Sequence, residues 1–409
     1  MHEYPAKFVP QIPSWAIRYA RLDVGETVLD PFCGCGTTLV EARIIGVNSY
    51  GIDIDPLARL ITRVKVTPLY PNKPELTYIA AKRLVQQIRN DSSKVDLHDQ
   101  PDVKLHYNWR FWFNENTMKM LIKIKRNIRS FIPPSVSEDS ETKAIREFFL
   151  VCLSSIVKKV SYLDEDQIKV RRSLSKVRRG ARNPFDAFEE AIQKNIIRIL
   201  SFAKKCKAHP QTYAKVIGND ARSLPLLDRS IDLIVTSPPY VNAIDYPFAH
   251  KHELFILDLV KPENYRPHSR NYIGVSERVL LKAMYADLHL CGYKPVDEYI
   301  QKIYFGGKDV DMNRAYVVYQ YFTGMRAFLK EAKRTLKDGR HLVIFVGDNR
   351  IRNVYVPTHV LLMKIAEEEF GFRTETFFYH QMKRKKLGLP RNKTGGEIEK
   401  EMAMVLRKE

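Results

Sequence analysis

Several features that mark particular classes of protein are missing from the sequence. No apolar run reaches the roughly 18 residues that a membrane-spanning helix needs, and the N-terminal residues lack the apolar stretch of a signal peptide. Cysteine is sparse, at five residues, which fits a reducing cytoplasm. No second Cys or His pair accompanies Cys33 and Cys35 at zinc-site spacing, and His250 and His252 lack further ligands, so we expect no metal.

Acidic residues are few relative to basic ones. The chain holds 67 Lys and Arg against 47 Asp and Glu, a net charge of +20. Much of the excess lies between Tyr70 and Lys215, where 29 basic residues face 16 acidic ones. A polyanionic partner is the natural interpretation. The alternative is a basic surface that serves only solubility.

Short apolar runs alternate with helical patterns at both ends of the chain. A strand over 27–30, a helix over 38–45 and a strand over 49–53 form the βαβ unit of a parallel sheet. Later runs predict further strands over 213–217, 231–236, 341–347, 373–379 and 402–407. An amphipathic helix is predicted over 325–336, closed by Gly339.

The middle of the chain has a helical period instead. Apolar residues recur on one helical face at the positions Phe188, Ile192, Ile196, Leu200 and Ala203. Further helices are predicted over 121–131 and 145–160, separated by two prolines. We therefore predict a catalytic domain from 1–69, 213–254 and 323–409. A basic helical insertion spans 70–212, and a second insertion, a candidate for target recognition, spans 255–322.

One glycine-rich turn follows the first strand and opens the first helix. It reads Asp30-Pro31-Phe32-Cys-Gly34-Cys-Gly36-Thr37-Thr38. Glycines let a backbone approach a ligand closely, and a helix N-terminus offers free N–H groups. Asp53 ends the next strand, where a carboxylate can accept both hydroxyls of a ribose. A nucleotide-like cofactor is indicated, although neither the NAD nor the ATP fingerprint is present; the alternative is a purely structural turn.

A second signal ends the strand over 231–236. The chain continues as Ser237-Pro238-Pro239-Tyr240, in which two prolines fix the backbone and remove two N–H donors. A hydroxyl, rigid carbonyls and an aromatic ring remain. Acceptors beside a stacking face suit a flat ring that bears an amino group. The alternative is a plain turn at a strand end.

Together the two motifs resemble those of the S-adenosylmethionine-dependent DNA amino-methyltransferases, which act on cytosine N4 or adenine N6. Residues 2–8, 50–56 and 240–246 are also similar to family motifs. The resemblance covers about 1–69, 213–254 and 323–409. It implies an α/β, Rossmann-like methyltransferase sheet of seven mostly parallel strands with helices on both faces. Ser rather than Asp at position 237 favours cytosine N4.

The resemblance also implies roles for individual residues. Asp30 and the loop through Gly34, Gly36, Thr37 and Thr38, with Pro31 and Phe32, would hold the methionine part of S-adenosyl-L-methionine. The remaining cofactor residues would be Lys7 and Phe8, which close that pocket, Asp53 at the ribose, Ile54 against the adenine and Asp220 at the adenine amine. The catalytic residues would be Ser237, Pro238, Pro239 and Tyr240, with Tyr240 stacked on a flipped base.

Double-stranded DNA is the expected partner. The segment 169–182 carries seven basic residues and no acid, so Arg171, Arg172, Arg178 and Arg179 are predicted to contact phosphates, unless the segment is a solvated loop. Lys383–Lys386 is a second candidate. The aromatic run Tyr107–Phe113 favours a hydrophobic anchor over a base-stacking wedge. A cytoplasmic, nucleoid-associated prokaryotic enzyme is expected, and a companion restriction endonuclease is left open.

Three alternatives stay open. Adenine N6 is the second choice of target. A tRNA guanine-N2 methyltransferase would share Asp-Pro-Phe-Cys-Gly, but we expect no preceding RNA-binding domain, because the first motif stands at residue 2. A DNA-binding protein on an inactive methyltransferase fold is disfavoured by the intact Gly34, Gly36, Asp53 and Ser237–Tyr240.

Overall fold

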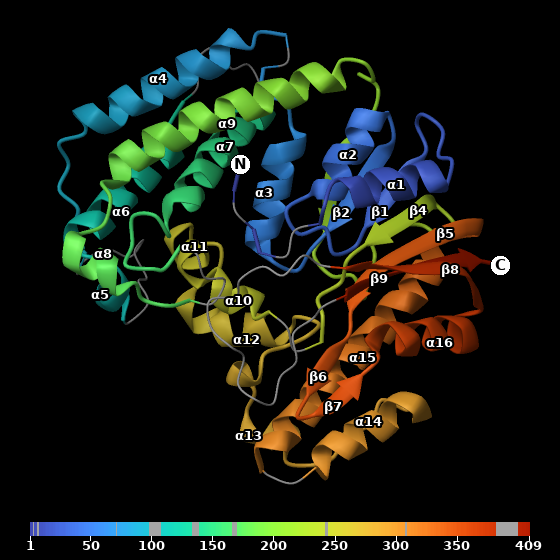
Figure 1. The fold of residues 1–409 in the computed structure, drawn as a ribbon. Helices are drawn as coiled ribbons and strands as arrows, with labels where there is room; N and C mark the ends of the chain where they lie inside the picture. Colours follow the sequence, from blue (N-terminus) through green and yellow to red (C-terminus); the bar gives the residue numbers. More distant parts are fainter. Residues whose placement is uncertain are drawn as a thin grey trace. The chain divides into compact units, whose positions relative to one another are not determined.

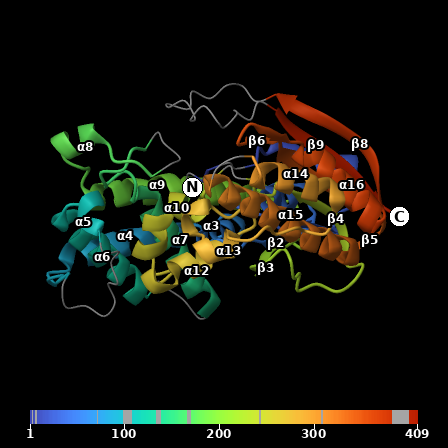
Figure 2. The same cartoon turned by 90° about the horizontal axis from the view of Figure 1, so that it is seen from below.

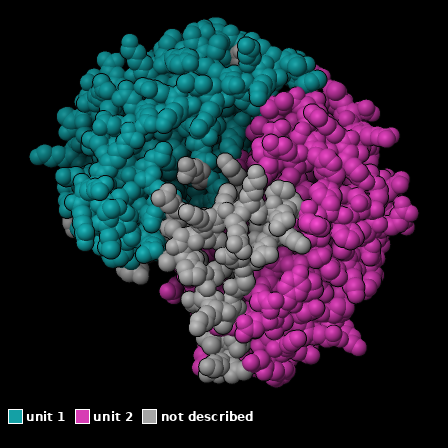
Figure 3. Space-filling model, viewed as in Figure 1, with its two compact units in different colours: residues 1–7, 56–210, 247–265 teal, residues 8–55, 211–246, 266–409 magenta. Residues whose placement is uncertain are grey.

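The computed structural model describes residues 1–2, 4–5, 8–70, 72–97, 108–132, 139–165, 170–241, 244–306, 309–381 and 400–409. The chain divides into two compact units (Figure 3). Unit 1 comprises residues 1–7, 56–210 and 247–265, and unit 2 comprises residues 8–55, 211–246 and 266–409.

A seven-stranded sheet forms the centre of unit 2 (Figure 1). Its order is β3-β2-β1-β4-β5-β9-β8, and β9 alone runs against its neighbours β5 and β8. The strands are β1 (Thr27–Asp30), β2 (Asn48–Ile52), β3 (Ala214–Gly218), β4 (Ile231–Thr236), β5 (Leu336–Gly347), β8 (Phe372–Gln381) and β9 (Lys400–Lys408). This topology confirms the predicted Rossmann-like methyltransferase sheet, and all seven strands match predicted runs to within a few residues.

Helices pack on both faces of this sheet, because alternate side chains of buried strands point to opposite sides. Leu233 and Val235 of β4 join one core with Ile17 of α1 (Gln11–Tyr19) and Ala42 of α2 (Thr37–Ile45). Ile234 joins a second core with α14 (Lys294–Tyr304), α15 (Asp309–Thr335) and α16 (Thr358–Phe370). Figure 2 shows these last three helices grouped beside the strands.

The predicted helix over 325–336 is wrong at its start and in its cap, although its end lies within one residue of the observed end. The helix α15 begins at Asp309, inside the predicted second insertion, and ends at Thr335. Gly339, with φ +74°, is not its C-cap but lies within β5. Ile231 pairs with Leu336 and Leu233 with His341, so residues 337–340 bulge from the ladder and require the left-handed glycine.

A small hairpin after β5 has no counterpart among the predicted elements. Strands β6 (Asn349–Ile351) and β7 (Val354–Val356) pair antiparallel across Arg352 and Asn353, which have φ +48° and +65°. Two positive φ values are what a tight two-residue hairpin turn requires. The other short elements of unit 2 are η2 (Glu277–Val279) and α13 (Lys282–Tyr285).

Unit 1 is built from helices. Its elements are α3 (Pro56–Val66), α4 (Glu75–Asn90), α5 (Trp109–Trp112), α6 (Glu115–Ser130), α7 (Asp139–Ile156), α8 (Leu174–Arg179), α9 (Pro184–Cys206), α11 (Lys251–Ile256) and η1 (Pro262–Asn264). The chain passes between the units within α10 (Tyr246–Ala249) and α12 (Tyr265–Arg270). No helix in the described part of the chain combines the length and apolarity needed to cross a membrane.

The longest helix of unit 1, α9, follows from the sequence. Asn183 caps it by accepting hydrogen bonds from the next two free amides, and proline occupies its first position. Phe188, Ile192 and Ile196 of the predicted stripe are buried. The stripe then continues at Ile199 rather than Leu200, because the true helical period is 3.6 residues rather than four.

The boundaries of the units differ from those of the predicted domains. Residues 56–69 and 247–254, predicted for the catalytic domain, belong to unit 1, and residues 266–322 belong to unit 2 with the sheet. The assignment of catalytic and DNA-binding roles to these segments stays a prediction.

Candidate active site

Asp30 ends β1 as a buried carboxylate with three hydrogen-bond donors. Its oxygens accept from the hydroxyl of Thr38 at 2.6 Å, the hydroxyl of Thr236 at 2.7 Å and the amide of Phe32 at 3.2 Å. Burial raises the pKa of Asp30 to about 6, although these donors oppose the shift. Asp30 thus fixes the glycine-rich turn by joining β1, α2 and β4. Its predicted contact with the cofactor stays a prediction.

The glycine-rich turn after Asp30 leads into α2, whose first amides have no side-chain cap. Gly34 and Gly36 have φ +50° and +77°, which side chains rarely tolerate. Gly36 is the N-cap of α2 and offers no side chain to cap it. The first-turn amide of half-buried Thr37 is therefore a candidate donor to a polar or anionic group, whereas Thr38 is fully buried. Phe32 packs edge-on against Phe328 of α15, with ring centroids 5.2 Å apart.

Asp53 follows β2 and faces the same turn. Its Oδ2 accepts from the Gly34 amide at 2.7 Å, and its Oδ1 accepts from the Asp55 amide at 2.8 Å. A carboxylate is a strong hydrogen-bond acceptor, so Asp53 has the chemistry to bind ligand hydroxyls. The structure thus brings together Asp53 and the glycine-rich turn, as expected of a nucleotide-type site, with Ile54 half-buried beside them.

Asp220 follows β3 and has a partner that the sequence did not suggest. The Arg222 guanidinium donates to both carboxylate oxygens at 2.8 Å, and the Arg222 amide donates at 2.9 Å. Burial pushes the pKa of Asp220 upward, but the hydrogen bonds and charge of Arg222 outweigh it and lower the pKa. Asp220 therefore stays ionised, and its contact with an adenine amine stays a prediction.

The Ser-Pro-Pro-Tyr motif begins where the fully buried strand β4 ends. Ser237 and Tyr240 are partly exposed, while Pro238 is buried between them. The Tyr240 phenol donates to Oε1 of Glu401 at 2.5 Å and is hydrogen-bonded to the Ser237 hydroxyl. Sequence reasoning missed Glu401, which stands at the start of β9 and is 161 residues from Tyr240.

Two further groups surround this motif. Burial, and then the charges of Asp53 and Asp55, raise the pKa of the Tyr246 phenol. A Cβ built on Gly274 would lie 3.6 Å from Pro239 Cβ, so the backbone at Gly274 supports the motif from behind. Gly274 was not predicted, since it lies outside the recognisable motifs, and Tyr246 lies in the motif over 240–246 but had no role assigned to it.

Gln320 of α15 holds this supporting segment. Its side-chain oxygen accepts from the Gly274 amide at 3.2 Å, and its amide group donates to the Tyr272 carbonyl at 2.8 Å. The Gln320 side chain thereby joins the segment 272–274 to α15.

Two predicted sites are only partly described. Phe8 packs edge-on against Phe345 of β5, at a centroid distance of 5.2 Å, while Lys7 lies outside the described residues. The basic residues Lys383–Lys386 also lie outside them. No group of three or more His, Cys, Asp or Glu within the described ranges is arranged to hold a metal ion.

The four arginines of the basic segment differ in their surroundings within unit 1. Arg171, Arg178 and Arg179 are exposed, the last two on α8. Arg172 is instead stacked on Phe111 and Tyr162, with its guanidinium 4.4 and 5.3 Å from the ring centroids. Cation–π contacts thus hold the Arg172 guanidinium against two aromatic rings, and its predicted phosphate contact stays a prediction.

The residues of the aromatic run Tyr107–Phe113 also differ in burial. Trp109 and Phe113 are buried in unit 1, and Phe113 and Trp112 contact the His252 ring. Phe111 is 47% exposed beneath Arg172. The hydrophobic-anchor interpretation fits Trp109 and Phe113; Tyr107 lies outside the described residues.

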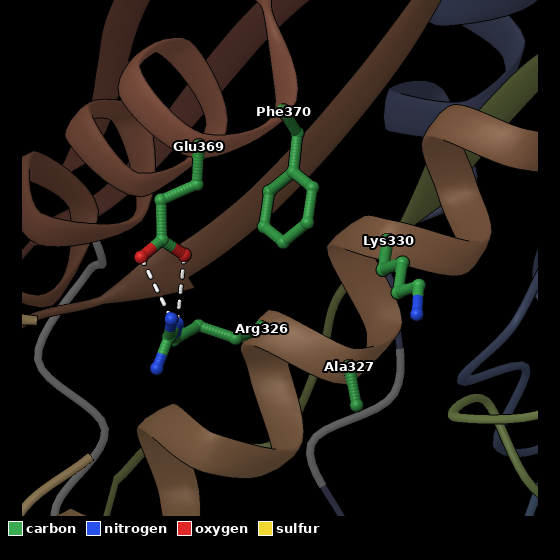
Figure 4. Close-up of a pocket in the computed structure, with 5 residues that line it drawn as sticks. All are labelled: Arg326, Ala327, Lys330, Glu369 and Phe370. Carbon is green, nitrogen blue, oxygen red and sulfur yellow. Dashed lines mark hydrogen bonds and ion pairs between the residues drawn. The ribbon is translucent and has the colours of Figure 1, made fainter. Parts of the chain in front are cut away.

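A shallow pocket lies between α15 and α16 (Figure 4). Arg326 and Glu369 form a bidentate ion pair at 2.7 Å on its wall. The pocket lies near the end of α16 that leads into the start of β8, whereas Asp53 and Ser237 follow the carboxyl ends of their strands. It is therefore not part of the candidate site.

Comparison with known proteins identifies the family of the chain. A family model described as DNA methylase matches residues 2–62 and 231–409. The chain belongs to the DNA methylase family. This confirms the predicted family of amino-methyltransferases, and S-adenosyl-L-methionine is the cofactor. The uncapped start of α2 and the Asp53 carboxylate beside the glycine-rich turn fit such a group.

Relatives of this DNA methylase cover most of its length. Type II methyltransferase M.MvaI of Kocuria varians is 23% identical over 96% of this chain and 87% of its own. Type II methyltransferase M.BsoBI of Geobacillus stearothermophilus is 24% identical over 90% and 77%. A tRNA (guanine(10)-N2)-dimethyltransferase of Methanocaldococcus jannaschii is 42% identical, but over only 13% of this chain and 15% of its own.

Proposed function

We propose that this DNA methylase transfers a methyl group from S-adenosyl-L-methionine to the N4 amine of a cytosine in double-stranded DNA. The observation that carries the proposal is the Ser237 hydroxyl at the end of β4, next to the rigid Pro238 carbonyl. A hydroxyl and a carbonyl are both hydrogen-bond acceptors, so they suit the two N–H bonds of an exocyclic amine.

The chemistry requires activation of a weak nucleophile. The lone pair of the cytosine amine is delocalised into the ring, which leaves it poorly reactive. Bound S-adenosyl-L-methionine supplies an electrophilic methyl group on a sulfonium. Ser237 and Pro238 would accept the two amine hydrogens, which favours a pyramidal nitrogen and aims its lone pair. No covalent intermediate with the protein is needed.

The target base has to leave the duplex before it reaches this motif. Amines inside stacked pairs are out of reach of an enzyme, so the cytosine would be flipped out and stacked on Tyr240. Exposed Arg171, Arg178 and Arg179 of unit 1 would hold phosphates. The two long matches to Type II methyltransferases support site-specific methylation on the prokaryotic nucleoid, beside a companion restriction endonuclease.

Base-resolved methylation mapping of DNA from cells that express the protein tests the assignment. N4-methylcytosine within one short recurring sequence is expected. N6-methyladenine would instead overturn the cytosine assignment, since adenine also presents an exocyclic amine, while leaving DNA amino-methylation intact. The mapped sequence also supplies the duplex needed for kinetic work.

Two remaining functions are separated by binding and substrate tests. A DNA-binding protein without activity would fail to bind S-adenosyl-L-methionine in calorimetry. A tRNA methyltransferase would methylate tRNA and leave duplex DNA unmodified. The short extent of the tRNA-enzyme match, 13% of this chain, favours DNA as the substrate.

A further inference from the structure

We propose that Glu401 is the terminal proton acceptor of methyl transfer, reached from the target amine through Ser237 and Tyr240. This inference rests on the proposed function, because it concerns the proton that an exocyclic amine must lose. It assigns a role to a residue that lies outside the sequence motifs described above.

The sheet brings Glu401 to the catalytic motif. The strand β9 runs antiparallel to β5, so its first residues lie at the edge where the parallel strands end. Glu401 pairs there with Gly347, the last residue of β5. From this position its Oε1 accepts from the Tyr240 phenol at 2.5 Å. Hydrogen bonds to charged groups are the shorter and stronger ones.

The chain of hydrogen bonds has a direction. The Ser237 hydroxyl donates to the Tyr240 oxygen, and the Tyr240 phenol donates to Glu401. Burial and the Glu401 charge raise the pKa of Tyr240 well above its ordinary value, so the phenol keeps its proton and remains a donor. Both hydroxyl hydrogens are thus committed toward Glu401, and the lone pairs of Ser237 Oγ are left to accept from the amine.

The proton and electron balance of the step is complete. The N4 nitrogen forms a bond to the methyl carbon as the sulfur–carbon bond breaks, and that electron pair stays on sulfur. The nitrogen then loses one proton to Ser237 Oγ and keeps the N–H electron pair. Ser237 passes its own proton to Tyr240, and Tyr240 passes its proton to Glu401. The carboxylate ends protonated and returns the proton to water.

The substitution Glu401→Gln tests this assignment, since it keeps the size and removes the basic carboxylate. Glu375→Gln is a matched control, because Tyr19 donates to Glu375 at 2.5 Å in a second Tyr–Glu pair on the neighbouring strand β8. Single-turnover methylation of a duplex carrying the mapped sequence gives the rate. Calorimetry with S-adenosyl-L-methionine and DNA titration give the two affinities, and circular dichroism shows whether each variant folds.

We expect Glu401→Gln to slow transfer about 100-fold, with both affinities within about twofold of the wild type. Glu375→Gln should stay within about twofold in rate. Tyr240→Phe cuts the same chain at its middle, so the double variant Tyr240→Phe/Glu401→Gln should be no slower than the slower single variant. Tyr240→Phe also provides the test if Glu401→Gln fails to fold. Its methylation rate should fall, while its affinities for S-adenosyl-L-methionine and for DNA should stay unchanged.

Three results would overturn the role of Glu401: an unchanged rate, an equal loss of rate and affinity, or multiplicative losses in the double variant. Failure of the proposed function is recognised separately by the product. If the wild type forms N6-methyladenine, the cytosine assignment fails, while the ratio of variant to wild-type rates still decides the role of Glu401.

Discussion

Thr38 donates its hydroxyl hydrogen to Oδ2 of Asp30 at 2.6 Å, and this bond joins the first turn of α2 to the end of β1. Asp30 is only 2% exposed, so ionising it requires removing a charge from water. Two hydroxyl donors and one amide reduce that penalty without cancelling it, as the pKa of about 6 shows. Holding Asp30 buried under the glycine-rich turn therefore lowers the unfolding free energy when the carboxyl group is ionised, so this loss of stability depends on pH.

Asp30→Asn should reveal this cost. Because the folded pKa of about 6 exceeds the ordinary 3.8, the contribution of Asp30 to stability is fully present below pH 3.8 and is lost as pH rises through 6. The unfolding free energy of the wild type, relative to Asp30→Asn, should fall by about 3 kcal/mol between about pH 3 and pH 7. Denaturant unfolding of both proteins across this range measures it; two parallel pH profiles would contradict the expectation.

Asp53→Ala should weaken S-adenosyl-L-methionine binding by about 2 kcal/mol, or about 30-fold in Kd. The variant removes the acceptors proposed for the ribose hydroxyls and releases the Gly34 amide that Asp53 now binds. Calorimetry measures the affinity. Asp228→Ala is the control, since Asp228 is 73% exposed and pairs with Arg334. Equal affinities for the two variants would exclude Asp53 from the cofactor site.

The parts of the site that were predictable are local in the sequence. A glycine-rich turn and a Ser-Pro-Pro-Tyr turn each follow an apolar run, and the carboxyl ends of parallel strands meet at one edge of a sheet. That rule alone placed Asp30, Asp53 and Ser237 at the same edge. The buried strands were predictable for the same reason, since apolar runs bounded by turn residues are a strong signal.

The parts that were missed depend on contacts between distant residues. Glu401 reaches Tyr240 only because β9 inserts in reverse between β5 and β8, and nothing in the sequence near Glu401 states that order. The stacking of Arg172 on Phe111 likewise joins two segments that are 61 residues apart. In the sequence, Gly339 indicates a helix cap, because a bulge and a cap both require a left-handed glycine.

Gln320→Ala should lower turnover several-fold while leaving S-adenosyl-L-methionine affinity nearly unchanged. Without this side chain, the Gly274 amide and the Tyr272 carbonyl lose their clamp, and the segment behind Pro239 loosens. Small errors in positioning are costly to rate when orientation supplies the catalysis. Single-turnover kinetics and calorimetry separate the two effects.

The conservative variant Gln320→Glu makes this test sharper. It retains an acceptor for the Gly274 amide but loses the donor to the Tyr272 carbonyl, so an intermediate rate is expected. A rate for Gln320→Ala equal to that of the wild type would show that Gly274 holds its position without the clamp.

The double variant Arg178→Ala/Arg179→Ala should weaken DNA binding about equally for all sequences. Both arginines are exposed on α8, and neither forms an ion pair with an acid among the described residues. An arginine that neutralises a phosphate releases counterions, so the slope of log affinity against log salt should shrink by about 0.9 for each phosphate that is no longer neutralised. Titration of labelled duplexes at several salt concentrations measures that slope.

Lys204→Ala/Lys205→Ala is the matched control, because it removes the same two charges from exposed positions at the far end of α9. Its salt slope should stay near that of the wild type, since a general loss of positive charge acts weakly through screening beyond about 10 Å. Equal slopes for the two double variants would show that DNA affinity depends only on net charge and that α8 is a solvated helix.

Arg172→Ala should act on stability instead. Because the variant loses the stacking on Phe111 and Tyr162, the stability of unit 1 should fall by about 1 kcal/mol.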